Sequence, residues 1–294
     1  MAREAGVNAQ RGTKRHGSRP SGKPKLGQNF LHDRGAAQKI VDALGDVSQR
    51  TVVEIGPGEG VLTDLLLPKA GRLVCVELDR VLAAQLRLRH ARAQNLEIIE
   101  ADVLKVNFPA LLTERPTPLI TRIDPGKADV IGNLPYYITS DILLRLFEFH
   151  QLFDRIVIMV QREVADRIAA KPGTSEYGLL SATAQLYTRV EKLFTLPPEA
   201  FAPPPKVHSA VLRLTVEPKF AELRVKPEPF IEFLKQNFAQ KRKTLVNNLR
   251  GIYQEDHIRS ALKGAGARPD VRAEALTLEK AAAIFRELWP GRPE

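Results

Sequence analysis

Short apolar runs alternate with amphipathic stretches through the first two thirds of the chain. Each run has the length and the β-branched content of a buried strand, and the stretch after it repeats its apolar residues every three to four positions, as a helix does. The expected strands are 51–55, 72–76, 95–99, 128–132 and 155–160, and the expected helices between them are 61–67, about 82–88, 139–149 and 161–170. This alternation predicts an α/β fold in which a parallel sheet carries helices on both faces.

The pattern changes toward the C-terminus. The remaining expected elements are a helix at 178–187, strands at 190–196 and 207–216, and helices at 227–238, 240–249, 255–263 and 277–288. The strand at 207–216 alternates well enough to pair antiparallel at the sheet edge. We therefore expect an α/β domain over 23–217 and a small all-helical domain over 218–294. Residues 1–22 lack apolar periodicity and are interpreted as a disordered basic tail.

Composition is that of an ordinary globular protein, with 44% hydrophobic and 27% charged residues. No stretch approaches the roughly 20 apolar residues that span a bilayer, and the N-terminus lacks the apolar core of a secretory signal. The single cysteine, Cys75, lies in the apolar run 73–76 and is expected to be a core residue and not a nucleophile. Because no internal disulfide can form, we expect a protein of the reducing cytoplasm.

Positive charge is the one unusual feature of the composition. The formal net charge is +10 and the isoelectric point is about 9.8, which favours a polyanionic partner, nucleic acid before membrane. Basic residues cluster in 1–25 and in Lys241, Arg242 and Lys243, close to Asn247, Asn248 and Arg250. Although such runs are often only solvated surface, we expect both clusters to contact phosphates.

A glycine-rich turn with the sequence Gly56-Pro57-Gly58-Glu59-Gly60 follows the first strand and opens a helix. Glycines let a ligand approach the backbone closely, and a helix N-terminus favours polar or negative groups. Glu77 and Asp102 end the next two strands, at the edge where open α/β sheets bind their ligands. There Glu77 can bind ribose hydroxyls and Asp102 an adenine amino group. The alternative is that each acid only caps a surface helix.

The type of ligand follows from what the glycine turn lacks. It has no phosphate-binding lysine, Pro57 interrupts it, and Val61 stands where a dinucleotide fingerprint has its third glycine. An adenosine ligand without phosphates fits better, which indicates S-adenosylmethionine, whose sulfonium cation Glu54 and Asp102 would accept electrostatically. No metal site is expected, because the six histidines are scattered and there is one cysteine.

The fourth expected strand runs into the turn Asn133-Leu134-Pro135-Tyr136. The carboxamide oxygen of Asn133 and a neighbouring backbone carbonyl, at 134 or 135, can both accept hydrogen bonds from an exocyclic amine. Pro135 stiffens the turn, and the ring of Tyr136 can stack on a base. In the alternative interpretation, the asparagine only bonds its own backbone and the tyrosines are packing.

These motifs together resemble the ribosomal RNA adenine N6,N6-dimethyltransferases, and within that family the bacterial small-subunit type. The resemblance covers roughly residues 23–290. It is carried, in order, by the motifs LGQNFL at 26–31, EIGPGEG at 54–60, VELD at 76–79, GNLPY at 132–136, QREVA at 161–165, FAPPPKVHSAV at 201–211 and QKRKTLVNNL at 240–249.

The resemblance implies that S-adenosylmethionine donates methyl groups to N6 of two adjacent adenines in a hairpin loop near the 3′ end of 16S rRNA. The acceptor would be a partly assembled small ribosomal subunit, and the enzyme a cytoplasmic monomer. The implied cofactor contacts are Asn29, Leu31, Gly56, Glu77, Asp102 and Asn133, and the implied base site consists of Asn133, Leu134, Pro135, Tyr136 and Phe201. Phe201 would cover the second face of the base, unless it only packs beneath the proline-rich turn.

Three other functions stay open. A large-subunit RNA methyltransferase of the antibiotic-resistance branch tends to have isoleucine where this chain has Leu134. A nicotinamide-dependent oxidoreductase is disfavoured by the glycine spacing and by the absence of a Tyr-x-x-x-Lys motif. A non-catalytic RNA-binding assembly factor on the same scaffold would not need the intact set of Glu77, Asp102 and Asn133.

Overall fold

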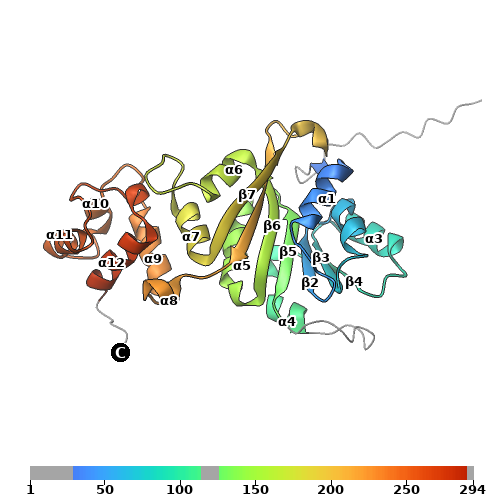
Figure 1. The fold of residues 1–294 in the computed structure, drawn as a ribbon, viewed down its shortest axis with the longest axis horizontal. Coiled ribbons are helices and arrows are strands. Elements are labelled where there is room, and N and C mark those ends of the chain that lie inside the picture. Colours follow the sequence, from blue (N-terminus) through green and yellow to red (C-terminus); the bar gives the residue numbers. More distant parts are fainter. Residues whose placement is uncertain (1–28, 114–125, 290–294) are drawn as a thin grey trace, which may run out of the picture.

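The structure, a computed structural model, describes residues 29–113 and 126–289 (Figure 1). These residues form a seven-stranded sheet with the strand order β4-β3-β2-β5-β6-β9-β7. Its parallel strands are β2 (Thr51–Ile55), β3 (Arg72–Glu77), β4 (Leu96–Glu100), β5 (Ala128–Asn133) and β6 (Phe153–Gln161). The predicted parallel sheet is confirmed, and the predicted tail at 1–22 lies outside the described residues.

Helices cover both faces of the sheet, as predicted. Alternate residues of each strand face opposite sides, so that Val53 and Ile55 belong to one hydrophobic cluster and Val52 to another. The first cluster includes residues of α4 (Phe108–Thr113), α5 (Thr139–Glu148), α6 (Arg162–Ile168) and α7 (Leu179–Tyr187). The second includes residues of α1 (Arg34–Asp42) and α2 (Val61–Leu66), and α3 (Arg80–Arg89) packs against β3 and β4.

The predicted antiparallel strand at 207–216 is correct in direction and wrong in place. It is β9 (Ser209–Val216), which lies between β6 and the edge strand β7 (Thr188–Leu196), antiparallel to both. Four of its apolar side chains, Ala210, Val211, Leu212 and Leu214, are completely buried, which requires cover on both faces. The edge position suits β7 because it carries Arg189, Glu191 and Lys192, and charged residues protect an edge strand.

The structure also contains a two-stranded sheet that the sequence did not predict. β1 (Phe30–Leu31) pairs antiparallel with β8 (Phe201–Ala202). The amide of His32 extends this pairing by donating to the carbonyl of Ala200, with an N–O distance of 3.0 Å. Strands of two residues carry no periodic signal, and this pairing joins segments about 170 residues apart. It holds the backbone around Asn29 against the carboxyl end of the large sheet.

After β9 the described chain is helical, with α8 (Phe220–Leu223), α9 (Pro227–Asn237), α10 (Leu245–Leu249), α11 (Glu255–Gly264) and α12 (Leu278–Leu288). The helix expected at 240–249 is shorter than predicted. Residues 240–243 form turns, because Thr244 caps α10 by accepting from the amide of Asn247. Residues 114–125, which follow α4, lie outside the described part of the chain.

The helical region packs directly on the α/β region. Tyr187 at the end of α7 contacts Phe220 of α8, with ring centroids 5.1 Å apart, and one hydrophobic cluster runs through both regions. The division into domains at residue 217 therefore stays a prediction. None of the described helices is both long enough and apolar enough to cross a membrane.

Candidate active site

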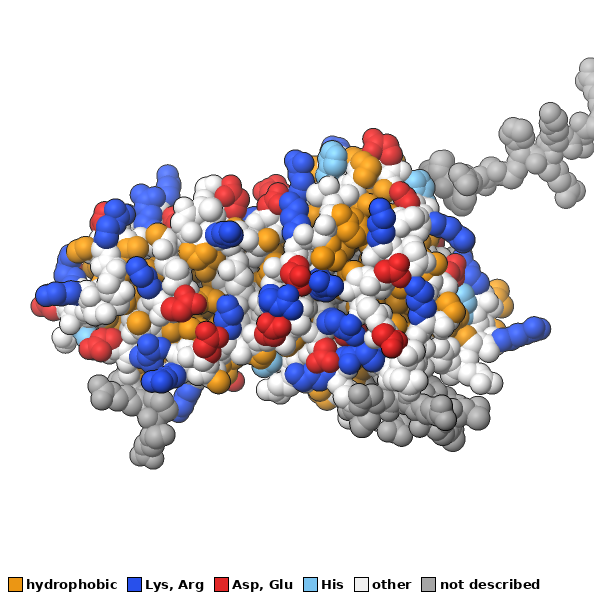
Figure 2. Space-filling view, in the orientation of Figure 1, with side chains coloured by type: hydrophobic (Ala, Val, Ile, Leu, Met, Phe, Trp, Pro, Cys, Tyr) orange, Lys and Arg blue, Asp and Glu red, His pale blue; other side chains and the backbone are white. Residues whose placement is uncertain are grey.

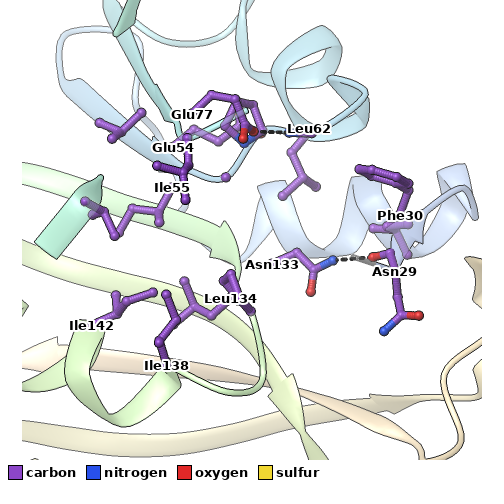
Figure 3. Close-up of a pocket in the computed structure, with 18 of the residues that line it drawn as sticks. Asn29, Phe30, Glu54, Ile55, Leu62, Glu77, Asn133, Leu134, Ile138 and Ile142 are labelled. Atoms are coloured by element: carbon purple, nitrogen blue, oxygen red, sulfur yellow. Dashed lines mark hydrogen bonds between the residues drawn. The ribbon is translucent and has the colours of Figure 1, made fainter. Parts of the chain in front are cut away.

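The carboxyl ends of β2, β3, β4 and β5 open onto one pocket (Figure 3). Every residue expected to contact the cofactor lines it, namely Asn29, Leu31, Gly56, Glu77, Asp102 and Asn133. Leu134, Pro135 and Tyr136 line it as well. The structure therefore brings together residues from five separate segments of the chain. Phe201 is the only predicted site residue that is not part of the lining.

Glu77 fixes the glycine turn to β3. It is almost fully buried, and each of its carboxylate oxygens accepts a backbone amide: Oε2 from Gly58 at 3.0 Å and Oε1 from Asp79 at 2.8 Å. Gly58 has a φ of 58°, and a Cβ there would come within 2.9 Å of the Phe30 ring. The turn therefore requires glycine at this position. Because each carboxylate oxygen can accept a second hydrogen bond, Glu77 can also bind two adjacent hydroxyls of a ligand.

Asp102 caps a short helix with one carboxylate oxygen and leaves the other at the pocket. Its Oδ1 accepts from the amide of Leu104 at 3.0 Å and so caps the one-turn helix Val103–Lys105. Its Oδ2 lies 4.0 Å from Nζ of Lys105, which is too far for a hydrogen bond. The second oxygen thus stays available to an amino group in the pocket.

Glu54 is a completely buried acid behind the glycine turn. Its Oε2 accepts from Thr63 Oγ1 at 2.7 Å and from Cys75 Sγ at 3.4 Å. Burial raises the pKa of Glu54 to about 7, and the nearby carboxylates of Glu77 and Asp64 add to that rise, while the two hydrogen bonds oppose it. The prediction that Cys75 is a core residue is confirmed, since it is fully buried and burial raises the pKa of its thiol.

We expect Glu54 to make the stability of the protein depend on pH. The folded state holds the proton of this carboxyl more tightly than the unfolded state, where the pKa is near 4.5. The free energy of unfolding therefore falls as the pH rises from about 4.5 through 7, and titration of Glu54 lowers it by about 3 kcal/mol in total. Glu54→Gln should match the wild type in free energy of unfolding at pH 5 and exceed it at pH 8. Urea denaturation at pH 5 and pH 8 measures the free energy of unfolding of both proteins. Glu59→Gln, in the same turn, is the control. The same pH dependence of stability in wild type and Glu54→Gln would contradict the prediction.

Asn133 is oriented by a backbone group from a distant part of the chain. Its Nδ2 donates to the carbonyl oxygen of Asn29 at 2.9 Å, so its Oδ1 faces the pocket (Figure 3). No residue within 29–113 or 126–289 donates a hydrogen bond to that Oδ1. The interpretation that this asparagine only bonds its own turn does not hold, because its partner lies 104 residues away.

The backbone carbonyls of Leu134 and Pro135 differ in the hydrogen bonds that they already accept. The carbonyl of Pro135 already accepts from the amide of Ile138 at 3.3 Å and from Thr139 Oγ1 at 3.0 Å. The amide of Leu134 donates to Met159 in β6, whereas the Leu134 carbonyl has no donor among the described residues. Of the two carbonyls that the sequence left open, the Leu134 carbonyl is therefore the one that remains free to accept from a ligand.

Two tyrosines follow, in contrasting environments. The hydroxyl of Tyr136 lies 2.8 Å from Oγ of the buried Ser209, and burial raises the pKa of this tyrosine. This contact fixes the Tyr136 ring against the pocket. Tyr137 also lines the pocket but is 65% exposed.

Phe201 does not present its ring to the pocket. It is 2% exposed and belongs to the hydrophobic cluster on the α1 and α2 face of the sheet, beneath the proline-rich turn. The aromatic residue that does line the pocket from this side is Phe30, which was not among the predicted site residues. Its contact with Gly58 depends on the β1–β8 pairing, so no local pattern could have identified it. Among the described residues, no group of three or more His, Cys, Asp or Glu side chains could hold a metal ion.

Comparisons with known proteins agree with this geometry. Residues 19–289 match the model of the family described as ribosomal RNA adenine dimethylase. The chain is 61% identical to ribosomal RNA small subunit methyltransferase A of Koribacter versatilis, over 93% of this chain and 97% of the relative. It is 54% identical to the protein of the same name from Acidobacterium capsulatum, over 90% and 91% of the two chains.

Solved structures give the same result. A dimethyladenosine transferase from Plasmodium falciparum superposes with a TM-score of 0.69 at 25% identity, covering 88% of this chain and 96% of that one. The 23S rRNA methyltransferase ErmE superposes with a TM-score of 0.63 at 25% identity, covering 88% and 99%. From the pocket geometry and these matches together, the chain belongs to the ribosomal RNA adenine dimethylase family.

Proposed function

We propose that this protein transfers methyl groups from S-adenosylmethionine to N6 of two adjacent adenines in a hairpin loop near the 3′ end of 16S rRNA, dimethylating both. The observation that carries the proposal is the paired acceptor at Asn133 Oδ1 and the Leu134 carbonyl, beside the acids at the neighbouring strand ends. The acceptor would be a small subunit in assembly, and the enzyme a cytoplasmic monomer. The high identity to proteins named ribosomal RNA small subunit methyltransferase A supports this choice of RNA.

The donor set fits an adenosine-containing cofactor without phosphates. Glu77 offers two acceptor oxygens for the ribose hydroxyls, and Asp102 offers Oδ2 to the adenine amino group. Apolar side chains of Leu78 and Val103 line the pocket between these acids, as the faces of a purine require. S-adenosylmethionine supplies an electrophilic methyl carbon bound to a sulfonium sulfur.

The chain's own residues prepare the acceptor nitrogen. The lone pair of adenine N6 is delocalised into the ring, so the amine is a weak nucleophile. When Asn133 Oδ1 and the Leu134 carbonyl accept its two N–H groups, they hold N6 in place and favour a tetrahedral nitrogen whose lone pair points at the methyl carbon. The N–C bond forms as the C–S bond breaks, and the cationic product amine releases its proton to water. This step needs positioning and no strong base.

Tyr136 would hold the base while this happens. The target adenine must leave its stack to reach the pocket, and a ring anchored at Ser209 offers it a new stacking surface. Such a contact is worth on the order of 1–3 kcal/mol per base. Phe201 would support the site by holding β1, and not by stacking, since its ring is buried.

The alternatives are less well supported. Identity to the structure of the large-subunit enzyme ErmE is 25%, against 61% to the small-subunit relative. A non-catalytic assembly factor would not need an acceptor pair open to the pocket. The test is transfer of labelled methyl to unmethylated 30S particles, with 50S particles and naked 16S RNA alongside. We expect label in the 30S; label in the 50S, or 30S binding without label, would contradict the proposal.

The basic turn before α10 should contact RNA phosphates. Lys241, Arg242 and Lys243 are exposed, and Lys241 Nζ reaches the carbonyl of Ser175, which links this turn to the loop before α7. Lys and Arg side chains are spread over both regions on the face drawn in Figure 2. Reversing the three charges to Glu should weaken 30S binding at least tenfold and reduce its salt slope by about two. Lys69→Glu, at a cation paired with Asp42, is the control; an unchanged salt slope for the triple variant would contradict the assignment.

A further inference from the structure

Tyr137 is an aromatic residue at the mouth of the pocket without a partner of its own. It is 65% exposed, and its ring and hydroxyl make no aromatic contact or hydrogen bond with residues 29–113 and 126–289. The preceding residue, Tyr136, is in contrast half-buried and held at Ser209. Single exposed apolar residues are common on protein surfaces, but this one lines the same pocket as Asn133. The ring of Tyr137 is therefore accessible to a ligand at the pocket.

The sheet order places basic residues at the strand ends beyond β5, on the side away from the cofactor strands. Beyond β5 come β6 and β9, each about 5 Å from its neighbour. Arg162 follows β6, and its amide donates to the carbonyl of His208 in the loop that also carries Lys206. Glu163 is the acid beside them. The edge of the sheet therefore changes from acidic at β3 and β4, on the cofactor side, to predominantly basic at β6 and β9. An RNA strand that leaves the pocket would follow the basic side.

We propose that Tyr137 forms a second base subsite, which stacks on the unpaired purine next to the adenine in the pocket. This inference rests on the proposed function and adds a subsite to it. An adenine that enters the pocket leaves its neighbour with one face unstacked. Tyr136 and Tyr137 are consecutive residues, with Cα atoms about 3.8 Å apart, so their rings can serve two different bases. Arg162 and Lys206 then lie where the backbone phosphates of that neighbour would pass.

The experiment varies the neighbouring base and the tyrosine together. Small-subunit particles are reconstituted with 16S rRNA that keeps one adenine of the pair and has G or U in place of the other, for each of the two positions. Values of kcat/KM are measured for wild type, Tyr137→Ala and Tyr137→Phe. Purines stack more strongly than pyrimidines. For at least one of the two positions of the retained adenine, we therefore expect Tyr137→Ala to lower kcat/KM about tenfold when the neighbour is G and clearly less when it is U. Tyr137→Phe keeps the ring and should stay close to wild type.

Two controls keep the outcome interpretable. Ile252→Ala removes another exposed apolar side chain, in the helical region, and should leave every kcat/KM value unchanged. The affinity of Tyr137→Ala for S-adenosylmethionine should equal that of the wild type. An equal loss with G and U in both arrangements, or no loss at all, would overturn the subsite. If the wild type methylates none of the particles, the proposed function itself fails, which is a different result.

Discussion

Replacing Asn133 with alanine should lower kcat for methyl transfer on the order of a thousandfold. The change removes the Oδ1 acceptor that faces the pocket and also the bond from Nδ2 to the carbonyl of Asn29. The adenine N6 is then no longer held in place, and it loses one of the two hydrogen bonds that favour a tetrahedral nitrogen. Losing positioning or one such hydrogen bond can lower a rate by 10² to 10³. Affinity for S-adenosylmethionine should fall but stay measurable. Single-turnover methylation of 30S particles and calorimetric cofactor titration separate these two effects.

Asn133→Asp distinguishes the acceptor from its orientation. Aspartate keeps an acceptor oxygen, but it cannot donate to Asn29 and would turn an oxygen toward that carbonyl. We expect its rate to lie between those of wild type and Asn133→Ala. Asn107→Ala, at an exposed asparagine that caps α4 outside the pocket, is the control and should be normal. Near-normal turnover of Asn133→Ala would contradict the mechanism.

Replacing Glu77 with alanine should raise the Kd for S-adenosylmethionine by about a hundredfold or more. The variant loses two charge-assisted acceptors for the ribose, each worth roughly 1.5–3 kcal/mol, and it leaves the buried amide of Gly58 without its partner. The glycine turn is then no longer tied to β3. The measurement is calorimetric titration with S-adenosylmethionine, together with circular dichroism to verify that the variant is folded.

The matched control for this variant is Glu100→Ala. Glu100 ends β4 directly opposite Glu77 in the strand register, but it is exposed and does not line the pocket. Its removal should leave cofactor affinity unchanged. A Kd for folded Glu77→Ala within a factor of three of the wild type would show that this carboxylate does not bind the cofactor.

The sequence predicted those parts of the site that follow from the large sheet. Gly56, Glu77 and Asn133 each end or directly follow a strand with a clear apolar signal, and Asp102 lies two residues beyond the end of another. Parallel strands bring their carboxyl ends to one edge of the sheet. Finding the strands was therefore enough to bring these residues together. The place of β9 was missed because pairing partners, unlike strands, leave no periodic signal in the sequence.

The details that decide the chemistry depend on contacts between distant segments. The bond from Asn133 to Asn29, the pairing of Leu31 with Phe201 and the burial of the Phe201 ring all arise from β1 and β8. Two-residue strands are invisible to pattern analysis. Which carbonyl, Leu134 or Pro135, stays free for a ligand likewise depends on the hydrogen bonds that the turn makes with Ile138 and Thr139, and a sequence pattern does not show these.

The most direct test of this account is position-resolved mass spectrometry of 16S rRNA from unmethylated 30S particles incubated with the protein and S-adenosylmethionine. We expect N6,N6-dimethyladenosine at two adjacent positions in a hairpin loop near the 3′ end, and we expect it to be lost with Asn133→Ala. Methylation at another atom or in another RNA, or dimethylation that persists in Asn133→Ala, would contradict it.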